Sequence, residues 1–256
     1  MIRRMTRPMR ISKVAVLSAL LAATVDAGHE VPDPSDRAIS GIGASQVTIL
    51  LRGPQSSRFQ ATVIAKRGRV LVAVTAAHCL AAAEAGKPVS IRRGESSLGG
   101  RIGKVIRNPA YREPRFPQIM GTDNAIITLH VDADGKGEAR VLEGIQAVGV
   151  ATGPIPSPTG QRVIVRIPDQ YGKVHVIPAG NYANPKMLTW GPKFHPVGGD
   201  SGAGVFVLRN VPGAKPAPIL IGVVVGADDR GGGASLIHAR HPWVVQSLDD
   251  EAESGR

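Results

Sequence analysis

The chain contains a single cysteine, Cys79, among its 256 residues. One cysteine cannot form an internal disulfide bond, so a small disulfide-stabilised fold is excluded and a hydrophobic core must supply the stability. Zinc sites built on cysteine pairs are excluded as well, and the seven histidines show no ligand-like spacing. We expect no metal and no cofactor. We interpret Cys79 as a small, buried apolar side chain rather than as a reactive thiol.

Aromatic residues are also scarce, at 4% of the chain, whereas glycine and proline are frequent, with 31 and 20 residues. This composition favours many short strands joined by turns over long helices. One or two helical turns are expected within residues 76–85, and a short helix with a packed Trp243 over residues 241–248. Short aliphatic runs between turn signals predict an antiparallel sheet, closed or sandwiched, with strands at residues 47–51, 61–65, 70–74, 88–91, 125–129, 148–150, 163–167, 174–177, 204–208, 219–225 and 234–237.

The N-terminal apolar segment, residues 14–23, has only ten residues, too few for a transmembrane helix, which needs about 20. Five basic residues precede this segment, and the small-residue sequence Val25-Asp26-Ala27 follows it. This arrangement is typical of a secretory signal peptide, which we predict at residues 1–27. We therefore expect a secreted or periplasmic protein without a stable membrane anchor.

Acidic residues are outnumbered, with 20 Asp and Glu against 31 Lys and Arg, and the formal net charge is +11. Removal of residues 1–27 takes away five basic residues and one acidic residue, which leaves 26 against 19 and a net charge of +7. No dense Lys/Arg block or nucleic-acid-binding motif accompanies this charge, so we expect no nucleic-acid partner. The basic surface should favour acidic surfaces or anionic substrates weakly.

Polar and turn-forming segments divide the chain. Residues 28–37 are polar and contain proline, which predicts either a disordered segment or a short pro-segment. A polar, glycine-containing linker over residues 132–137 separates two β-rich parts, which we place at residues 38–140 and 141–256. The spaced aspartates of the linker resemble a calcium-binding loop only superficially, because the later ligand positions do not follow that pattern.

The stretch Gly198-Gly199-Asp200-Ser201-Gly202 is the most informative about chemistry. A serine on a glycine-rich turn stands clear of its own backbone, and the glycines let a substrate carbonyl approach main-chain N–H groups. Ser201 is the candidate nucleophile. The N–H groups of Gly199 and Ser201 are the candidate oxyanion hole.

Two further stretches supply the other groups that acyl transfer requires. His78 follows an apolar strand in Thr75-Ala76-Ala77-His78-Cys79, so its ring can project into a cleft as the general base. Asp123 precedes another apolar strand in Asp123-Asn124-Ala125-Ile126, where its carboxylate can be buried against His78. The three catalytic candidates follow one another in the chain order His, Asp, Ser.

Taken together, these three motifs resemble the trypsin/chymotrypsin-like serine endopeptidase family, over roughly residues 38–248. The resemblance implies an all-β fold of two six-stranded antiparallel β-barrels packed face to face, with a short C-terminal helix. His78 and Asp123 would come from the N-terminal barrel and Ser201 from the C-terminal barrel. The resemblance also implies protein or peptide substrates, and we expect a monomer.

The resemblance extends to an activation junction at Arg37 and Ala38. In the family, the residue in the place of Asp200 typically pairs with a buried cation, often the amino terminus that activation frees. Cleavage after Arg37 would let the amino group of Ala38 take that role, and an internal arginine is the competing partner. The disulfide that the family forms beside the histidine is absent, because Cys79 has no second cysteine to pair with.

A specificity pocket is expected from His195, Val225 and Gly226. His195 stands six residues before Ser201, where trypsin-type enzymes have an aspartate, so a preference for basic side chains lacks its usual counter-charge. His195 could pair with an acidic substrate side chain or hydrogen-bond within its loop. Asp228 and its neighbour Asp229 could instead attract a basic side chain.

Two other functions compete with peptide hydrolysis. The first is a non-catalytic relative that keeps the fold as a binding module, which the loss of a triad residue would indicate; none is lost. The second is an esterase or other serine hydrolase of the α/β type. That class has the chain order Ser, Asp, His and a Gly-x-Ser-x-Gly turn, and this chain has neither.

Overall fold

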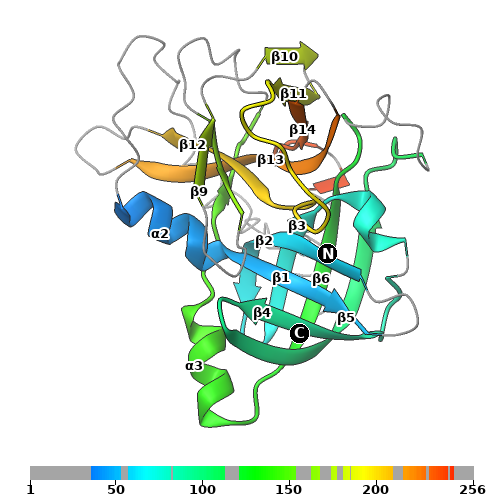
Figure 1. The fold of residues 1–256 in the computed structure, drawn as a ribbon. Helices are drawn as coiled ribbons and strands as arrows, with labels where there is room; N and C mark the ends of the chain where they lie inside the picture. Colours follow the sequence, from blue (N-terminus) through cyan, green and yellow to red (C-terminus); the bar gives the residue numbers. More distant parts are fainter. Residues whose placement is uncertain are drawn as a thin grey trace, which may run out of the picture.

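Six antiparallel strands in the first half of the chain close into a barrel, shown in blue to green in Figure 1. The barrel order is β1-β2-β3-β6-β5-β4, and β4 pairs with β1 to close it. The strands are β1 (Gln46–Leu51), β2 (Ser57–Arg67), β3 (Val70–Thr75), β4 (Pro88–Arg93), β5 (Ser96–Arg107) and β6 (Ala125–Asp132). The computed structural model describes residues 36–52, 57–81, 83–112, 121–153, 163–167, 174–177, 181–184, 186–209, 216–228, 231–241 and 243–244.

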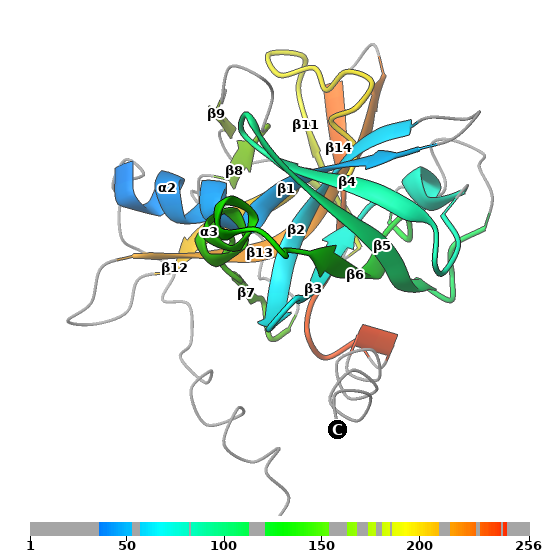
Figure 2. The same ribbon diagram turned by 90° about the horizontal axis from the view of Figure 1, so that it is seen from below.

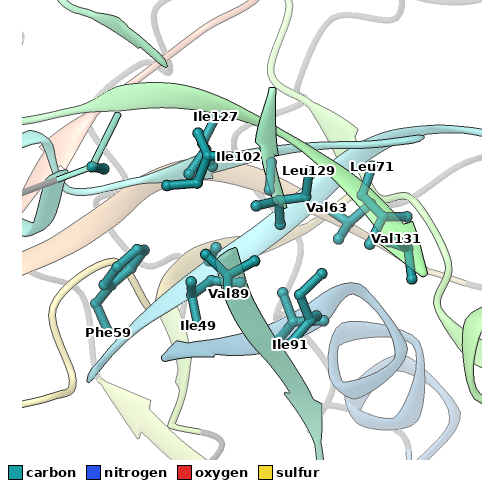
Figure 3. Packing of buried hydrophobic residues seen from close by; sticks show 14 of the residues in the cluster. Ile49, Phe59, Val63, Leu71, Val89, Ile91, Ile102, Ile127, Leu129 and Val131 are labelled. Atoms are coloured by element: carbon teal, nitrogen blue, oxygen red, sulfur yellow. The ribbon is translucent and has the colours of Figure 1, made fainter. Parts of the chain in front are cut away.

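Alternation of apolar and polar residues explains the barrel. Every second side chain of a strand points to the same face, and the inward-facing positions here are almost all aliphatic. Figure 3 shows these side chains meeting inside the barrel. Each of them contributes about 1.5–3 kcal/mol by leaving water. Fully buried members of this core include Ile49, Phe59, Val63, Leu71, Ile91, Ile102, Ile127 and Leu129.

The second half of the chain forms a curled eight-stranded sheet in the described residues, with the order β10-β11-β14-β13-β12-β8-β9 and with β7 parallel to β13. The predicted all-β double-barrel class is confirmed, and the first barrel has the six strands expected. The second half is an open, half-barrel sheet. Its strands are β7 (Gly149–Val150), β8 (Val163–Arg166), β9 (Val174–Ile177), β10 (Asn181–Asn184), β11 (Met187–Trp190), β12 (Gly204–Arg209), β13 (Ala217–Asp228) and β14 (Gly231–Leu236).

Three helices accompany the strands among the described residues: α2 (Asp36–Ser45), the short 3-10 helix η1 (Ala77–Leu80) and α3 (Lys136–Gly144). Helix α2 packs on β8 and β13, and α3 packs on β5 at the outside of the barrel (Figures 1 and 2). The segment predicted as a linker, residues 132–137, overlaps the last residue of β6 and the first two residues of α3. Glu138 of α3 accepts hydrogen bonds from the N–H groups of Asp134 and Gly135, which satisfies donors at the start of that helix.

A second apolar cluster joins the barrel to the sheet. Outward-facing residues of β3 and β6 are apolar because the second sheet covers them, and they pack against β8, β12 and β13. Trp243 belongs to this cluster and is buried, as predicted, although most of the predicted C-terminal helix lies outside the described residues. We call this the interface cluster; its fully buried members include Val74, Ala76, Ile126, Ile164, Phe206 and Val223.

The predicted signal peptide, residues 1–27, and nearly all of the predicted pro-segment lie outside the described residues. Within the part of the chain that is described, no helix has both the length and the apolar character needed to cross a bilayer. The predicted boundary between residues 140 and 141 falls inside α3, and the two-domain division stays a prediction.

Candidate active site

His78 and Asp123 lie side by side because β3 and β6 are antiparallel neighbours. Thr75, the last residue of β3, pairs with Ala125, the first residue of β6. His78 follows the end of β3 and Asp123 precedes β6, so this register brings the two side chains together. His78 Nδ1 lies 2.6 Å from Asp123 Oδ2, and the backbone N–H of His78 donates to Asp123 Oδ1 over 2.9 Å. Both carboxylate oxygens therefore contact His78.

The two side chains differ in exposure, with 3% of Asp123 and 35% of His78 accessible. Burial of the imidazole by itself disfavours its charged form. The hydrogen bond to Asp123 and the contact with Cys79 favour the charged form more strongly, and they raise the pKa of His78 from 6.5 to about 10. The buried carboxylate of Asp123 therefore favours the protonated form of His78.

Backbone hydrogen bonds to both halves of the molecule fix the turn that carries Ser201. The carbonyl of Ser201 accepts from Gln60 N of the barrel over 2.9 Å, and Gly202 N donates to Val224 O of β13 over 2.8 Å. Gly199 and Gly202 have φ values of 95° and 87°. These values lie in the left-handed region that only glycine adopts without strain, which explains the glycines on either side of the nucleophile candidate.

Three N–H groups of this turn have no acceptor within the described residues. The N–H groups of Asp200 and Ala203 donate to carbonyls of the same loop, and that of Val197 donates to Asp200 Oδ2. In contrast, the N–H groups of Gly198, Gly199 and Ser201 donate to no acceptor in the described chain. Those of Gly199 and Ser201 are the donors that the sequence predicted for an oxyanion, and they are available for a ligand.

The outer imidazole nitrogen of His78 faces a sulfur atom. His78 Nε2 lies 3.5 Å from Cys79 Sγ, and across the described residues no hydrogen bond joins Nε2 to Ser201 Oγ. Cys79 is partly exposed and packs against both the barrel core and the interface cluster. Cys79 therefore packs against apolar residues as predicted, but it is only partly buried and its sulfur also contacts the candidate base.

Gln60 is a buried polar residue of the site that the sequence analysis missed. Its backbone N–H holds the carbonyl of Ser201, and its own carbonyl accepts a 2.6 Å hydrogen bond from Thr75 Oγ1, just ahead of the histidine. A signal was present, since Gln60 and Thr62 alternate with the apolar Phe59, Ala61 and Val63. Such a residue needs hydrogen-bond partners when it is buried.

Asn124 is a second buried polar residue beside the candidate triad. Its side-chain amide donates to Ser235 Oγ over 2.6 Å and to the carbonyl of Leu236 over 3.2 Å, both in β14. Its side-chain oxygen accepts from Asn108 Nδ2 over 3.2 Å. Asn124 thus connects the segment that carries Asp123 to the second sheet.

The three predicted pocket residues lie in different environments. His195 is exposed, whereas Val225 is 5% exposed and packs in the interface cluster, where it offers little surface to a substrate. Gly226 is half-buried and sits at an irregularity in the pairing of β13 with β14. A pocket formed by these residues stays a prediction, with His195 as the accessible side chain. Asp228 is described only in its backbone, and Asp229 lies outside the described residues.

The activation junction also remains a prediction. Arg37 and Ala38 lie in the first turn of helix α2. The carboxylate of Asp200 accepts the 2.9 Å hydrogen bond from Val197 N–H and has further interactions. As for metals, no three His, Cys, Asp or Glu side chains are grouped to hold an ion within the described ranges.

Two solved structures share this fold. A thermostable serine protease, AL20, from an extremophilic microorganism covers 81% of this chain and 99% of its own, with a TM-score of 0.54 and 13% identity. Neuropsin, a serine protease expressed in the limbic system of mouse brain, covers 82% of this chain and 96% of its own, with a TM-score of 0.52 and 15% identity. No protein-family model and no curated protein matches the sequence. The predicted resemblance to trypsin-like proteases is thus confirmed as a likeness of fold.

Proposed function

We propose that this chain is an exported serine endopeptidase that hydrolyses peptide bonds with a His78–Asp123–Ser201 triad. The observation that carries the proposal is the 2.6 Å contact between His78 Nδ1 and Asp123 Oδ2, made in a fold that serine proteases share. The N–H groups of Gly199 and Ser201, which have no acceptor in the described chain, support it as donors to an oxyanion. The signal peptide predicted at residues 1–27 supports export.

In the proposed first step, Ser201 Oγ attacks the carbonyl carbon of the scissile bond and gives its proton to His78 Nε2. For this transfer the imidazole of His78 must be neutral, and its Nε2 must face Oγ instead of Cys79 Sγ. The electron pair of the C=O bond moves to the oxygen, which the N–H groups of Gly199 and Ser201 stabilise. Asp123 holds the tautomer of His78 and stabilises the imidazolium.

In the second step the C–N bond breaks, and His78 Nε2 donates its proton to the leaving amine. This leaves an acyl group on Ser201 Oγ. Water then attacks the acyl carbon, with His78 again accepting a proton, and the collapse of this intermediate releases the carboxylic acid product and free Ser201.

The alternative is a binding module that keeps the fold without catalysis. Two observations bear on it: the contact between His78 and Cys79, and the raised pKa of His78, which disfavours the neutral imidazole that a general base requires. Both describe the unliganded chain. Hydrogen bonds in an active site often form only when a substrate is bound, so the chemistry must be tested directly.

The decisive experiment is covalent labelling of the purified, exported protein with a fluorophosphonate probe, followed by mapping of the labelled peptide. We expect the label on Ser201 and its loss in Ser201→Ala and His78→Ala. Replacement of Ser201 by Ala should lower kcat by about 10⁶-fold with the fold intact.

The matched control is Ser96→Ala, which removes an exposed serine of the β4–β5 hairpin and should leave labelling unchanged. Absence of label on folded, N-terminally processed protein would favour the binding module. Absence only while residues 28–37 are still attached would indicate an unactivated precursor.

A further inference from the structure

A hollow of about 610 Å³ opens on the first barrel. Its lining comes from strands β1, β2, β4 and β5 and from the residue that follows β1. None of its described lining residues comes from the second sheet. Three arginines and three serines dominate the lining: Arg52, Arg58, Arg92, Ser57, Ser90 and Ser97. We call this site the arginine hollow.

The arginine hollow lies on the outer face of β1 and β2. The same face continues along these strands to residues beneath the turn that carries Ser201. Along β1, the outward-facing Thr48 is buried, Leu50 is half-buried and Arg52 is exposed. On β2, Gln60 pairs with Thr48, and Arg58 pairs with Leu50. The turn that carries Ser201 therefore covers this face at Gln60 and leaves it open from Arg58 onwards.

Arg58 connects the arginine hollow to that turn. A Cβ atom placed on Gly199 would lie 3.8 Å from Arg58 Cδ, so the aliphatic part of Arg58 packs next to Gly199. The N–H of Gly199 is one of the two unpartnered donors of the candidate oxyanion hole. A peptide that lies across Ser201 can thus reach the arginine hollow without leaving the surface of the protein.

The positive charge in the arginine hollow is not neutralised. Arg52, Arg58 and Arg92 are all exposed, and none of their side chains forms an ion pair or hydrogen bond with another residue of the described chain. Among the described lining residues there is no Asp or Glu. Three guanidinium groups around one hollow repel one another, and a bound anion would relieve that repulsion.

A buried hydroxyl points to a ligand independently of the charge. Ser57 Oγ is shielded from solvent and has no hydrogen-bond partner among the described residues. Ser90 Oγ and Ser97 Oγ, in contrast, bond each other over 2.6 Å. An unpaired buried hydroxyl is unfavourable, and a ligand with an acceptor oxygen would satisfy it.

We propose that the arginine hollow binds the carboxylate side chains of an acidic peptide segment, and that this segment belongs to the substrate of the candidate active site. The second part rests on the proposed peptidase function. A guanidinium group presents two parallel N–H donors to a carboxylate, which makes arginine the residue suited to this ligand. His195, Val225 and Gly226 all lie in the second half of the chain, so they would contact a different part of the same substrate.

The test measures binding to the Ser201→Ala variant, which cannot cleave a peptide. An Asp-rich peptide is compared with the same peptide carrying Asn in place of each Asp. We expect the Asp-rich peptide to bind more tightly, by about tenfold at low salt, and the difference to shrink as salt screens the charges. In that background Arg52→Gln with Arg92→Gln should weaken binding of the Asp-rich peptide by about fivefold to tenfold.

The matched control removes two exposed arginines elsewhere on the barrel, by Arg67→Gln with Arg101→Gln, and should leave binding of both peptides nearly unchanged. Equal weakening by the control pair would overturn the proposal, because it would show a general effect of net charge. Equal binding of the two peptides to the parent protein would overturn it as well.

Labelling of Ser201 separates this proposal from the proposed function. If Ser201 is labelled and the two peptides are bound alike, the acidic-peptide site fails and the peptidase stands. If the preference for the Asp-rich peptide persists without labelling, the arginine hollow stands as the ligand site of a binding module, and its link to a substrate fails.

Discussion

The side-chain amide of Gln60 donates a hydrogen bond to the backbone carbonyl of Gly199 over 3.1 Å. Gln60 is fully buried, and its side-chain oxygen accepts a 2.9 Å hydrogen bond from Thr48 Oγ1. Its backbone N–H holds the carbonyl of Ser201 at the same time. One residue of the first barrel therefore positions the carbonyls of both residues whose N–H groups are the candidate oxyanion donors.

This relationship predicts the effect of Gln60→Leu, which keeps the approximate size of the side chain and removes its polar atoms. The hydroxyl of Thr48 would lose its acceptor, at a cost of about 1–3 kcal/mol in stability. Loosening of the turn at Gly199 should lower kcat by about 10–100-fold with little change in KM, because the oxyanion forms only in the transition state. Steady-state kinetics and urea unfolding measure the two effects separately.

Thr48→Val is the matched control for Gln60→Leu. It removes the hydroxyl partner of Gln60 and leaves the amide donor to Gly199 in place. We expect a smaller loss of kcat with a comparable loss of stability. A Gln60→Leu variant that is less stable and retains full kcat would show that Gln60 only supports the fold.

Cys79→Ala should change the pH dependence of activity. The sulfur of Cys79 contacts His78 Nε2 and is one of the causes of the raised pKa of His78. Without it the pKa of His78 should fall, and the imidazole should become the neutral base at lower pH. We expect the acid limb of the pH profile of kcat/KM to lie above pH 6.5 in the parent protein and to move to lower pH in the variant. Identical profiles for both proteins would refute this role of the sulfur.

The pairing of His78 with Asp123 should make stability depend on pH in a defined window. The pKa of His78 is raised from 6.5 to about 10 in the folded chain, so the folded chain binds this proton more tightly than the unfolded chain. The stabilisation is complete below pH 6.5 and is lost as pH rises towards 10. The difference in free energy of unfolding between the parent protein and Asp123→Asn should therefore be largest near pH 6 and shrink towards pH 10.

Urea unfolding at several pH values between 6 and 10 measures that difference. Glu95→Gln, which neutralises an exposed carboxylate, is the control and should show no such trend. If the difference in free energy of unfolding between the parent protein and Asp123→Asn stays constant over this pH range, the contact between Asp123 and His78 does not hold a proton on His78.

The strands of the first barrel were predictable because their apolar residues form uninterrupted short runs. β5 was missed, since Gly99, Gly100 and Gly103 break its run. Helix α3 was missed for a related reason, because its charged and glycine residues resemble a linker. The bonds of Glu138 to Asp134 and Gly135 are local, but the packing of α3 on β5 is a tertiary contact that local sequence does not contain.

The residues of the candidate site were likewise predictable only in part. The sequence identifies His78, Asp123 and Ser201 because their motifs depend on side chains that chemistry requires. Gln60 and Asn124 act through partners more than 100 residues away in the chain, Gly199 and Ser235, so only the structure could pair them. The environment of Val225 was also beyond prediction from sequence, because its burial depends on how the second sheet packs on the barrel.

Asn124→Leu should destabilise the connection between the two halves. The variant leaves Ser235 Oγ and the carbonyl of Leu236 without their buried donor, which should cost about 2–5 kcal/mol in free energy of unfolding. Because Asp123 is the adjacent residue, kcat should also fall. Ser235→Ala removes only one acceptor and should cost less, and thermal unfolding of both variants gives the order. Equal stability of Asn124→Leu and the parent protein would rule out this connection as a source of stability.

Gly202→Ala should be among the most damaging single substitutions. Gly202 has a φ of 87°, and a Cβ atom there would overlap the carbonyl oxygen of Gln60 and Oγ1 of Thr75. Neither of these atoms can move without breaking the hydrogen bonds that hold the turn of Ser201, so we expect a loss of more than about 4 kcal/mol or a failure to fold. Gly137→Ala is the control, because Gly137 lies in α3 with open space around it. That variant should gain about 0.4–1 kcal/mol in free energy of unfolding. A stable, active Gly202→Ala variant would mean that the turn does not depend on this close approach between the two halves.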